Sequence, residues 1–130
     1  SSQWIKSFSP KHGFESTTLS DIDVLQPYMA PDFNVTLANH FSKYRYTRPF
    51  YYGRFHNMVY AYLFSKTKNG VIRFSQSPDG AGPENPAWDF HYIVPGYKVG
   101  KEYSFKVRLM YKEWISQEDI ELEYRKWTDQ

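Results

Sequence analysis

The sequence has 130 residues, of which 41% are hydrophobic and 23% charged, proportions typical of a folded globular domain. Its formal net charge of +2 gives no electrostatic reason to expect nucleic acid or an anionic membrane surface as a partner. The absence of cysteine excludes disulfides and thiolate metal sites, and no segment approaches the ~18 consecutive apolar residues of a membrane span. We therefore expect one soluble domain over residues 1–130, with a neutral or mixed-charge ligand.

The N-terminal part of the chain predicts short strands on either side of a short helix. Residues 1–16 suit a strand followed by a turn, because bulky apolar residues are interrupted by proline and glycine. The segment Thr17–Met29 carries apolar residues at helical spacing, with acidic residues after Ser20, which predicts a short helix or helical turn that ends near Pro27. Period-two alternation then predicts strands over residues 33–38 and 44–47.

The middle of the chain predicts a long central strand. Residues 50–64 are apolar or aromatic at nearly every position, so both faces of such a strand would be covered. The polar turn that follows ends in Asn69-Gly70, the strongest short-range hairpin signal. We therefore expect a tight hairpin between this strand and a second strand over residues 71–76.

The C-terminal part predicts a loop, two strands and a helix. Residues 77–87 hold three prolines and two glycines, which predict a long loop before a strand over residues 88–94. Residues 101–111 alternate strictly, so we expect their apolar side chains to face the core and their polar ones the solvent. Ser116 then begins a helix with an apolar stripe that should dock onto the domain. The stripe consists of Ile120, Tyr124 and Trp127.

The order of these elements predicts the fold class. Roughly seven short strands joined by turns, with helical segments only near the two ends, favour an antiparallel β-sandwich or jelly roll over an alternating β-α layout. We therefore expect a mainly β protein with a short N-terminal helical segment and a C-terminal helix.

Aromatic residues make up 20% of the sequence, more than one small core needs. Sugars present apolar C–H patches bordered by hydroxyls, so a sugar-binding surface combines flat rings with hydrogen-bonding groups. If residues 50–64 form one strand, rings and donors share one of its faces, and neighbouring strands add more. The alternative is that these tyrosines belong to the core. The candidate ligand-binding residues are Arg54, His56, Tyr60, Tyr62, Arg73, Trp88, His91 and Arg108.

No motif in the sequence is specific for a metal, a nucleotide or a hydrolytic nucleophile. The four histidines lack the spacing of a zinc site, and the acidic residues of the loop over residues 77–87 match no calcium-binding loop. Glycine-rich phosphate loops and the nucleophile elbow are also absent. We therefore expect neither a metal nor a cofactor.

The prediction for function is a non-catalytic carbohydrate-binding or ligand-recognition module, with a glycan or a small molecule as its partner. Two alternatives stay open. A small polysaccharide-acting enzyme of lyase or glycosidase type would use a His, Tyr and Arg site around His56. A structural or interaction domain of a larger enzyme would use an apolar surface as its interface. The oligomeric state and the localisation stay open, secretion or a periplasmic location included.

Overall fold

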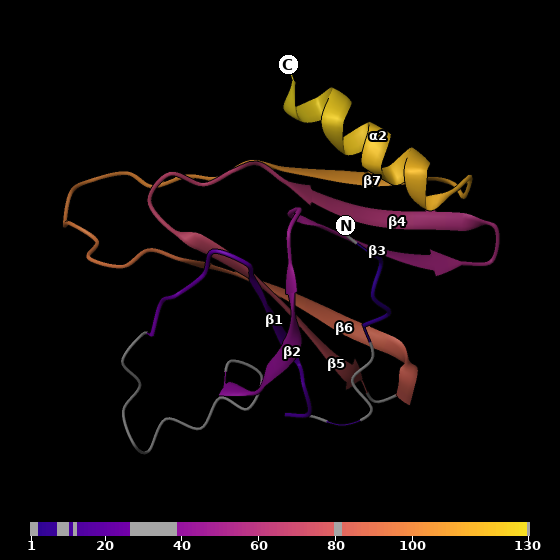
Figure 1. Cartoon of the computed structure of the whole chain (residues 1–130), viewed down its shortest axis with the longest axis horizontal. Helices are drawn as coiled ribbons and strands as arrows, with labels where there is room; N and C mark the ends of the chain where they lie inside the picture. The colour runs from indigo at the N-terminus through magenta and orange to yellow at the C-terminus, as the bar shows by residue number, and fades with distance from the viewer. Residues whose placement is uncertain (1–2, 8–10, 12, 27–38, 80–81, 130) are drawn as a thin grey trace. The chain divides into compact units, whose positions relative to one another are not determined.

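The computed structural model describes residues 3–7, 11, 13–26, 39–79 and 82–129. The chain divides into two units, each built around one β-sheet (Figure 1). Strands predominate and a helix lies near the C-terminus, which confirms the expectation of a mainly β protein. Unit 1 consists of Ser1–Arg48 and Lys68–Lys101, and unit 2 consists of Pro49–Thr67 and Glu102–Gln130.

Unit 1 contains a four-stranded sheet in the order β2-β1-β5-β6. The pairing between β1 and β2 is parallel, and the pairings of β5 with β1 and β6 are antiparallel. An entirely antiparallel arrangement was therefore too simple an expectation. The strands are β1 (Thr17–Ser20), β2 (Phe41–Tyr46), β5 (Val71–Asp79) and β6 (Gly82–Ile93).

The helix predicted over Thr17–Met29 is wrong for the residues that the structure describes. Thr17–Ser20 forms β1, which lies between two other strands. Pairing along both edges of β1 satisfies its backbone and outweighs a helical spacing of apolar residues that is only a few residues long. The strand predicted over residues 44–47 lies largely within β2, whereas the one predicted over residues 33–38 falls outside the described residues.

The long loop predicted over residues 77–87 is also wrong, because β5 and β6 continue through most of it as a hairpin. Proline is tolerated in a sheet on an edge strand or beside a bulge, where no ladder donor is lost. Strand β6 is at the edge of its sheet, and the register shifts next to Pro78. The prolines that suggested a loop therefore lie where a sheet accepts them.

Unit 2 contains an antiparallel three-stranded sheet in the order β3-β4-β7. The single strand predicted over residues 50–64 is wrong, since the chain reverses at His56 and Asn57. His56 has a φ of +54°, a left-handed conformation that tight two-residue hairpins require. The elements of this unit are β3 (Phe50–Phe55), β4 (Met58–Phe64), β7 (Val107–Glu113) and α2 (Gln117–Thr128).

The hairpin predicted at Asn69-Gly70 does not form. Strand β4 is already paired with β3 on one side and β7 on the other, so it has no edge left for β5. Gly70 instead lies where the chain enters unit 1, and a Cβ there would be 2.3 Å from the carbonyl oxygen of Ile93. The close approach of β6 accounts for glycine at this position.

Helix α2 covers one face of the unit 2 sheet, as its predicted apolar stripe required (Figure 1). The Ser116 hydroxyl caps the helix by accepting a hydrogen bond from the backbone N–H of Asp119, at 3.0 Å. Among the described residues no helix is long and apolar enough to cross a membrane. The buried cluster beneath α2 consists of Val59, Ala61, Leu63, Met110, Ile120 and Tyr124.

The orientation predicted for residues 101–111 is reversed. Met110 lies beneath α2, whereas Leu109 and Tyr111, expected in the core, are 55% and 64% exposed. The regular strand also begins only at Val107. Strict alternation identifies two faces of a strand, but α2 decides which of them is buried.

The turn at His56 can be tested by substitution. Glycine adopts positive φ without steric cost and a β-branched residue does not, so His56→Gly should be more stable than His56→Val by about 1–2 kcal/mol. Urea unfolding monitored by circular dichroism measures the difference. Equal stabilities of the two variants would contradict the left-handed turn.

Candidate functional site

The register of the unit 2 sheet separates the predicted ligand-binding residues. Residues directly opposite each other on paired strands share a face. Tyr60 is opposite Gly53 on β3 and Tyr111 on β7, whereas Arg54 is opposite Val59 of the buried cluster. The reversal at residues 56 and 57 thus places Arg54 on the face of α2 and Tyr60 on the other face.

The face opposite α2 carries an exposed group of aromatic and aliphatic side chains. Phe55 and Tyr111 are 71% and 64% exposed, and Tyr60 lies at the border between half-buried and exposed. Large apolar side chains that gather on an open sheet face are typical of a ligand or protein contact surface. We call this surface the tyrosine face, and its exposed or half-buried members are Tyr51, Phe55, Met58, Tyr60, Tyr62, Val107, Leu109 and Tyr111. Phe64 lies on the same face by register but is buried.

Three tyrosines form the centre of this face. The ring centroids of Tyr60 and Tyr62 are 5.4 Å apart at an interplanar angle of 86°, and those of Tyr60 and Tyr111 are 6.5 Å apart at 64°. The rings are therefore crossed and do not form one flat platform. Edge-to-face contacts of this kind are the favoured geometry for aromatic pairs.

The hydroxyls of Tyr60 and Tyr62 form a polar centre within this apolar surface. Their oxygens are 3.1 Å apart, a hydrogen-bond distance. The hydrogen bond to Tyr60, with partial burial, raises the pKa of Tyr62 above its usual value of 10.0. Tyr62 is therefore neutral at physiological pH. One proton joins the two oxygens.

The two predicted arginines of unit 2 lie on the other face. The Arg54 guanidinium carbon is 4.3 Å from the ring centroid of Trp114, a cation–π contact. Arg108 Nη1 is 3.1 Å from a carboxylate oxygen of Glu123 on α2. Both side chains therefore fasten the sheet to the C-terminal segment and contribute nothing to the tyrosine face.

His56 has an exposed side chain in the hairpin turn. Its ring contacts the Phe55 ring edge-to-face, with centroids 4.3 Å apart. The acid–base site predicted around His56 is not assembled in unit 2, because Arg54 and Tyr60 occupy opposite faces of the sheet. Within the described residues, no three His, Asp or Glu side chains gather as a metal site would require.

Arg73 in unit 1 is a structural residue. It is 3% exposed, and its Nε and Nη2 donate to the two carboxylate oxygens of Asp23 at 2.7 and 3.0 Å. Nη2 also donates to the carbonyl oxygen of Leu25 at 2.9 Å. The Arg73 guanidinium is thus held by partners from its own unit, and a ligand would have to displace a buried carboxylate to reach it.

The other two candidates of unit 1 lie on opposite faces of its sheet. His91 is directly opposite Arg73, and it is half-buried. Trp88 is three residues earlier on β6, so it points the other way, where its ring lies 6.4 Å from that of Phe90. Trp88 and His91 therefore do not form one site.

Of the eight predicted residues, the structure brings only Tyr60 and Tyr62 together on an exposed face. Leu109 and Tyr111 also lie on this face, although the alternation of residues 101–111 had predicted that both are in the core. The available signal was the excess of aromatic residues on both faces of neighbouring strands, which one core cannot bury completely.

No protein-family model matches the chain, and no curated protein and no solved structure is significantly similar to it.

The Arg73–Asp23 pair generates a prediction for stability. Burial by itself raises the pKa of Asp23, but hydrogen bonds from Arg73 and Leu25 and the charges of Arg73 and Arg45 bring it below its usual 3.8. The pair therefore contributes its full stability above the pKa of the unfolded carboxyl, and this is lost as the pH falls through the folded pKa. Asp23→Asn should cost about 3–5 kcal/mol at pH 7.

The exposed Asp21, two residues away, provides the matched control. Thermal unfolding of the wild type, Asp23→Asn and Asp21→Asn between pH 7 and pH 3 measures the effect. Asp21→Asn should behave like the wild type, and the deficit of Asp23→Asn should shrink in acid. A deficit that is equal for both variants, or constant with pH, contradicts the assignment.

Proposed function

We propose that the tyrosine face binds a glycan chain, so that the protein is a non-catalytic carbohydrate-binding module. The observation that carries this proposal is the exposed group of crossed tyrosine rings around a hydrogen-bonded hydroxyl pair. The rings offer apolar faces and edges to C–H patches, and the hydroxyls offer hydrogen bonds to sugar hydroxyls.

The chemistry of the face favours a neutral ligand. By register, the carboxylate on this face is that of Glu113, which lies opposite Met58 at one end of the sheet. The ion-paired side chains of Arg108 and Lys112 face α2 instead. Gly53 adds no side chain, so nothing on β3 lies directly opposite the ring of Tyr60. A neutral sugar ring fits such a surface better than a charged one.

The ring angles favour one kind of glycan over another. A flat crystalline polysaccharide needs coplanar rings, and Tyr60 is inclined at 86° to Tyr62 and at 64° to Tyr111, so the central ring is coplanar with neither neighbour. A single soluble chain can turn successive sugars toward differently inclined rings. We therefore expect binding to soluble glycan chains and not to crystalline ones.

One further function has a specific observation in its favour. Val107 and Leu109, 47% and 55% exposed, are aliphatic and offer no hydrogen bond to a sugar. Side chains of this kind suit a protein–protein interface, the interaction-domain alternative. Analytical ultracentrifugation of the wild type and Leu109→Lys separates the two functions, since only an interface between copies predicts a wild-type oligomer that the substitution dissociates.

We also propose that the two sheets pack as a sandwich and that residues 1–130 form a single domain. Small-angle scattering of the whole chain would measure whether the protein is as compact as a sandwich of this length must be.

Substitution of the central tyrosines tests glycan binding. Each aromatic truncation should weaken binding by about 3- to 10-fold, because stacking contacts contribute about 0.5–1.5 kcal/mol each. Isothermal titration calorimetry with a panel of soluble glycans should therefore show weaker binding for Tyr60→Ala and Tyr111→Ala. Tyr60→Phe keeps the ring and isolates the contribution of the hydroxyl pair.

Tyr97→Ala is the control, since Tyr97 is 72% exposed in unit 1 and does not belong to the tyrosine face. It should bind like the wild type. Absence of binding to every soluble glycan, or equal losses in Tyr97→Ala and Tyr60→Ala, would overturn the proposal.

A further inference from the structure

A pocket of about 230 Å³ lies at the C-terminal end of α2, on the face of the unit 2 sheet that the helix covers. It is formed where β4 and β7 extend beyond their last regular pair. The backbone N–H of Lys106 donates to Ser65 Oγ at 3.0 Å, and the N–H of Ser65 donates to the Lys106 carbonyl at 2.9 Å. The lining residues are Ser65, Lys106, Trp127 and Thr128.

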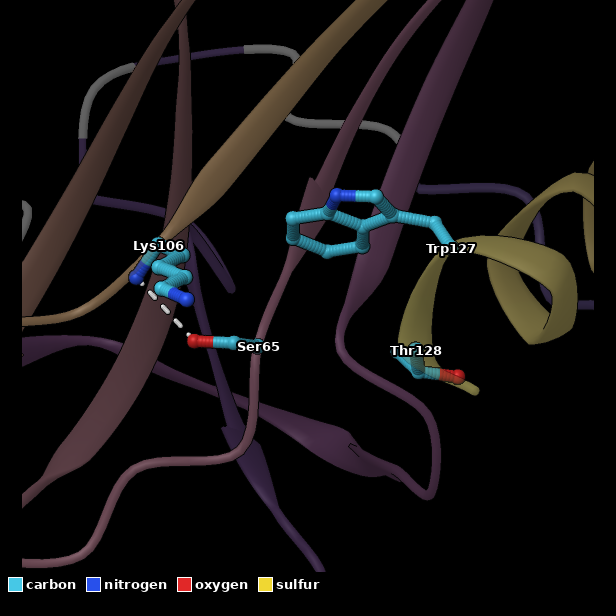
Figure 2. Close-up of a pocket in the computed structure, with 4 residues that line it drawn as sticks. All are labelled: Ser65, Lys106, Trp127 and Thr128. Atoms are coloured by element: carbon cyan, nitrogen blue, oxygen red, sulfur yellow. Dashed lines mark hydrogen bonds between the residues drawn. The ribbon is translucent and has the colours of Figure 1, made fainter. Parts of the chain in front are cut away.

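Figure 2 shows how the pocket is built: the indole of Trp127 extends from the helix toward the strands that carry Ser65 and Lys106. Thr128 lies on the helix side, and its hydroxyl donates to the carbonyls of Tyr124 and Arg125. Thr128 therefore has no proton to offer a ligand. The space is bounded by an aromatic wall on one side and polar groups on the other.

Both polar groups on the strand side are donors. Ser65 Oγ already accepts a hydrogen bond from a backbone N–H, so its own proton can be donated to a ligand. The Lys106 ammonium has three donors and a positive charge. A ligand that satisfies them carries hydrogen-bond acceptors and a negative charge.

Lys106 has an exposed side chain that forms no ion pair with the described residues of unit 2. Three cationic side chains, those of Lys106, Arg108 and Lys112, lie on the α2 face of β7 and of the residue just before it. Two of them have carboxylate partners on α2. Arg108 pairs with Glu123, and Lys112 pairs with Asp119 at 2.8 Å. Lys106 lies beyond these carboxylates, beside the last helical turn, where Arg125 and Lys126 are basic. Within the described residues it has no ion-pair partner.

The volume limits the ligand to one ring. Sites for drug-sized molecules have volumes of roughly 300–1,000 Å³, so a pocket of this size does not hold an oligomer. A saturated sugar ring has an apolar C–H face that can pack against the indole, and a carboxylate on that ring can reach an ammonium.

We propose that this pocket binds a single anionic sugar ring of the hexuronate type. Its C–H face stacks on Trp127, its carboxylate pairs with Lys106, and Ser65 donates to a ring hydroxyl. The site is distinct from the tyrosine face, and the proposal does not depend on glycan binding there.

Nuclear magnetic resonance of the ¹⁵N-labelled full chain tests this proposal. Glucuronate should shift the Trp127 indole N–H signal saturably, whereas glucose, which lacks the carboxylate, and acetate, which lacks the ring, should bind at least about fivefold more weakly. The signal of Trp127 is assigned by its loss in Trp127→Phe. No saturable shift with glucuronate, or an equal affinity for glucose, overturns the proposal.

Two substitutions test the role of Lys106 in binding without changing the buried cluster. Lys106→Met should weaken glucuronate binding at least about fivefold. Lys126→Met should leave it unchanged, because Lys126 is on the same helical turn as Trp127 but does not line the pocket. Equal affinities of Lys106→Met and the wild type overturn the proposal.

Tyr111→Ala distinguishes this site from the tyrosine face. The substitution should leave the glucuronate-induced shift of Trp127 intact even if it abolishes binding of neutral glycans. If it also removes the Trp127 shift, the uronate binds elsewhere and the pocket is not its site.

Discussion

The packing of α2 against one face of the β3-β4-β7 sheet determines the character of unit 2. Ile120 and Tyr124 are buried against a cluster that includes Leu63 and Met110, and Ser116 fixes where the helix begins. One helix can cover only one face of a sheet of this size. On the face that α2 does not cover, Tyr60 and Tyr111 are exposed and Tyr62 is half-buried. The pocket beside Trp127 lies where the end of α2 meets Ser65 and Lys106, just beyond the regular ends of β4 and β7.

Local patterns in the sequence were sufficient for α2 and for most strand segments. The cap at Ser116 and the stripe that ends at Trp127 are properties of a few neighbouring residues, and both are confirmed. The chain reversal at His56 was missed because the turn contains no glycine, and an unbroken apolar run looks the same in one strand or in a hairpin. That one turn moved Arg54 to the face opposite Tyr60.

Partners distant in the sequence were beyond local reasoning. Asp23 and Arg73 are 50 positions apart and form a buried, bidentate ion pair. The sequence around either residue gives no sign of the other. Arg73 was therefore predicted to bind a ligand, although it binds a carboxylate of its own unit. The same limit applied to β7, where the exposed position of Tyr111 follows from the docking of a helix that comes later in the chain.

The distribution of side chains on this sheet argues that stability alone did not determine it. Arg108 and Lys112 lie on the covered face, where their partly exposed ion pairs with α2 contribute only about 0–1 kcal/mol each. Leu109 and Tyr111 lie on the open face, where polar residues would be the stable and soluble choice. Exchanging the two sets would bury more apolar surface beneath the helix. The glycan site proposed at the crossed tyrosines would account for a surface that keeps its rings exposed at this cost.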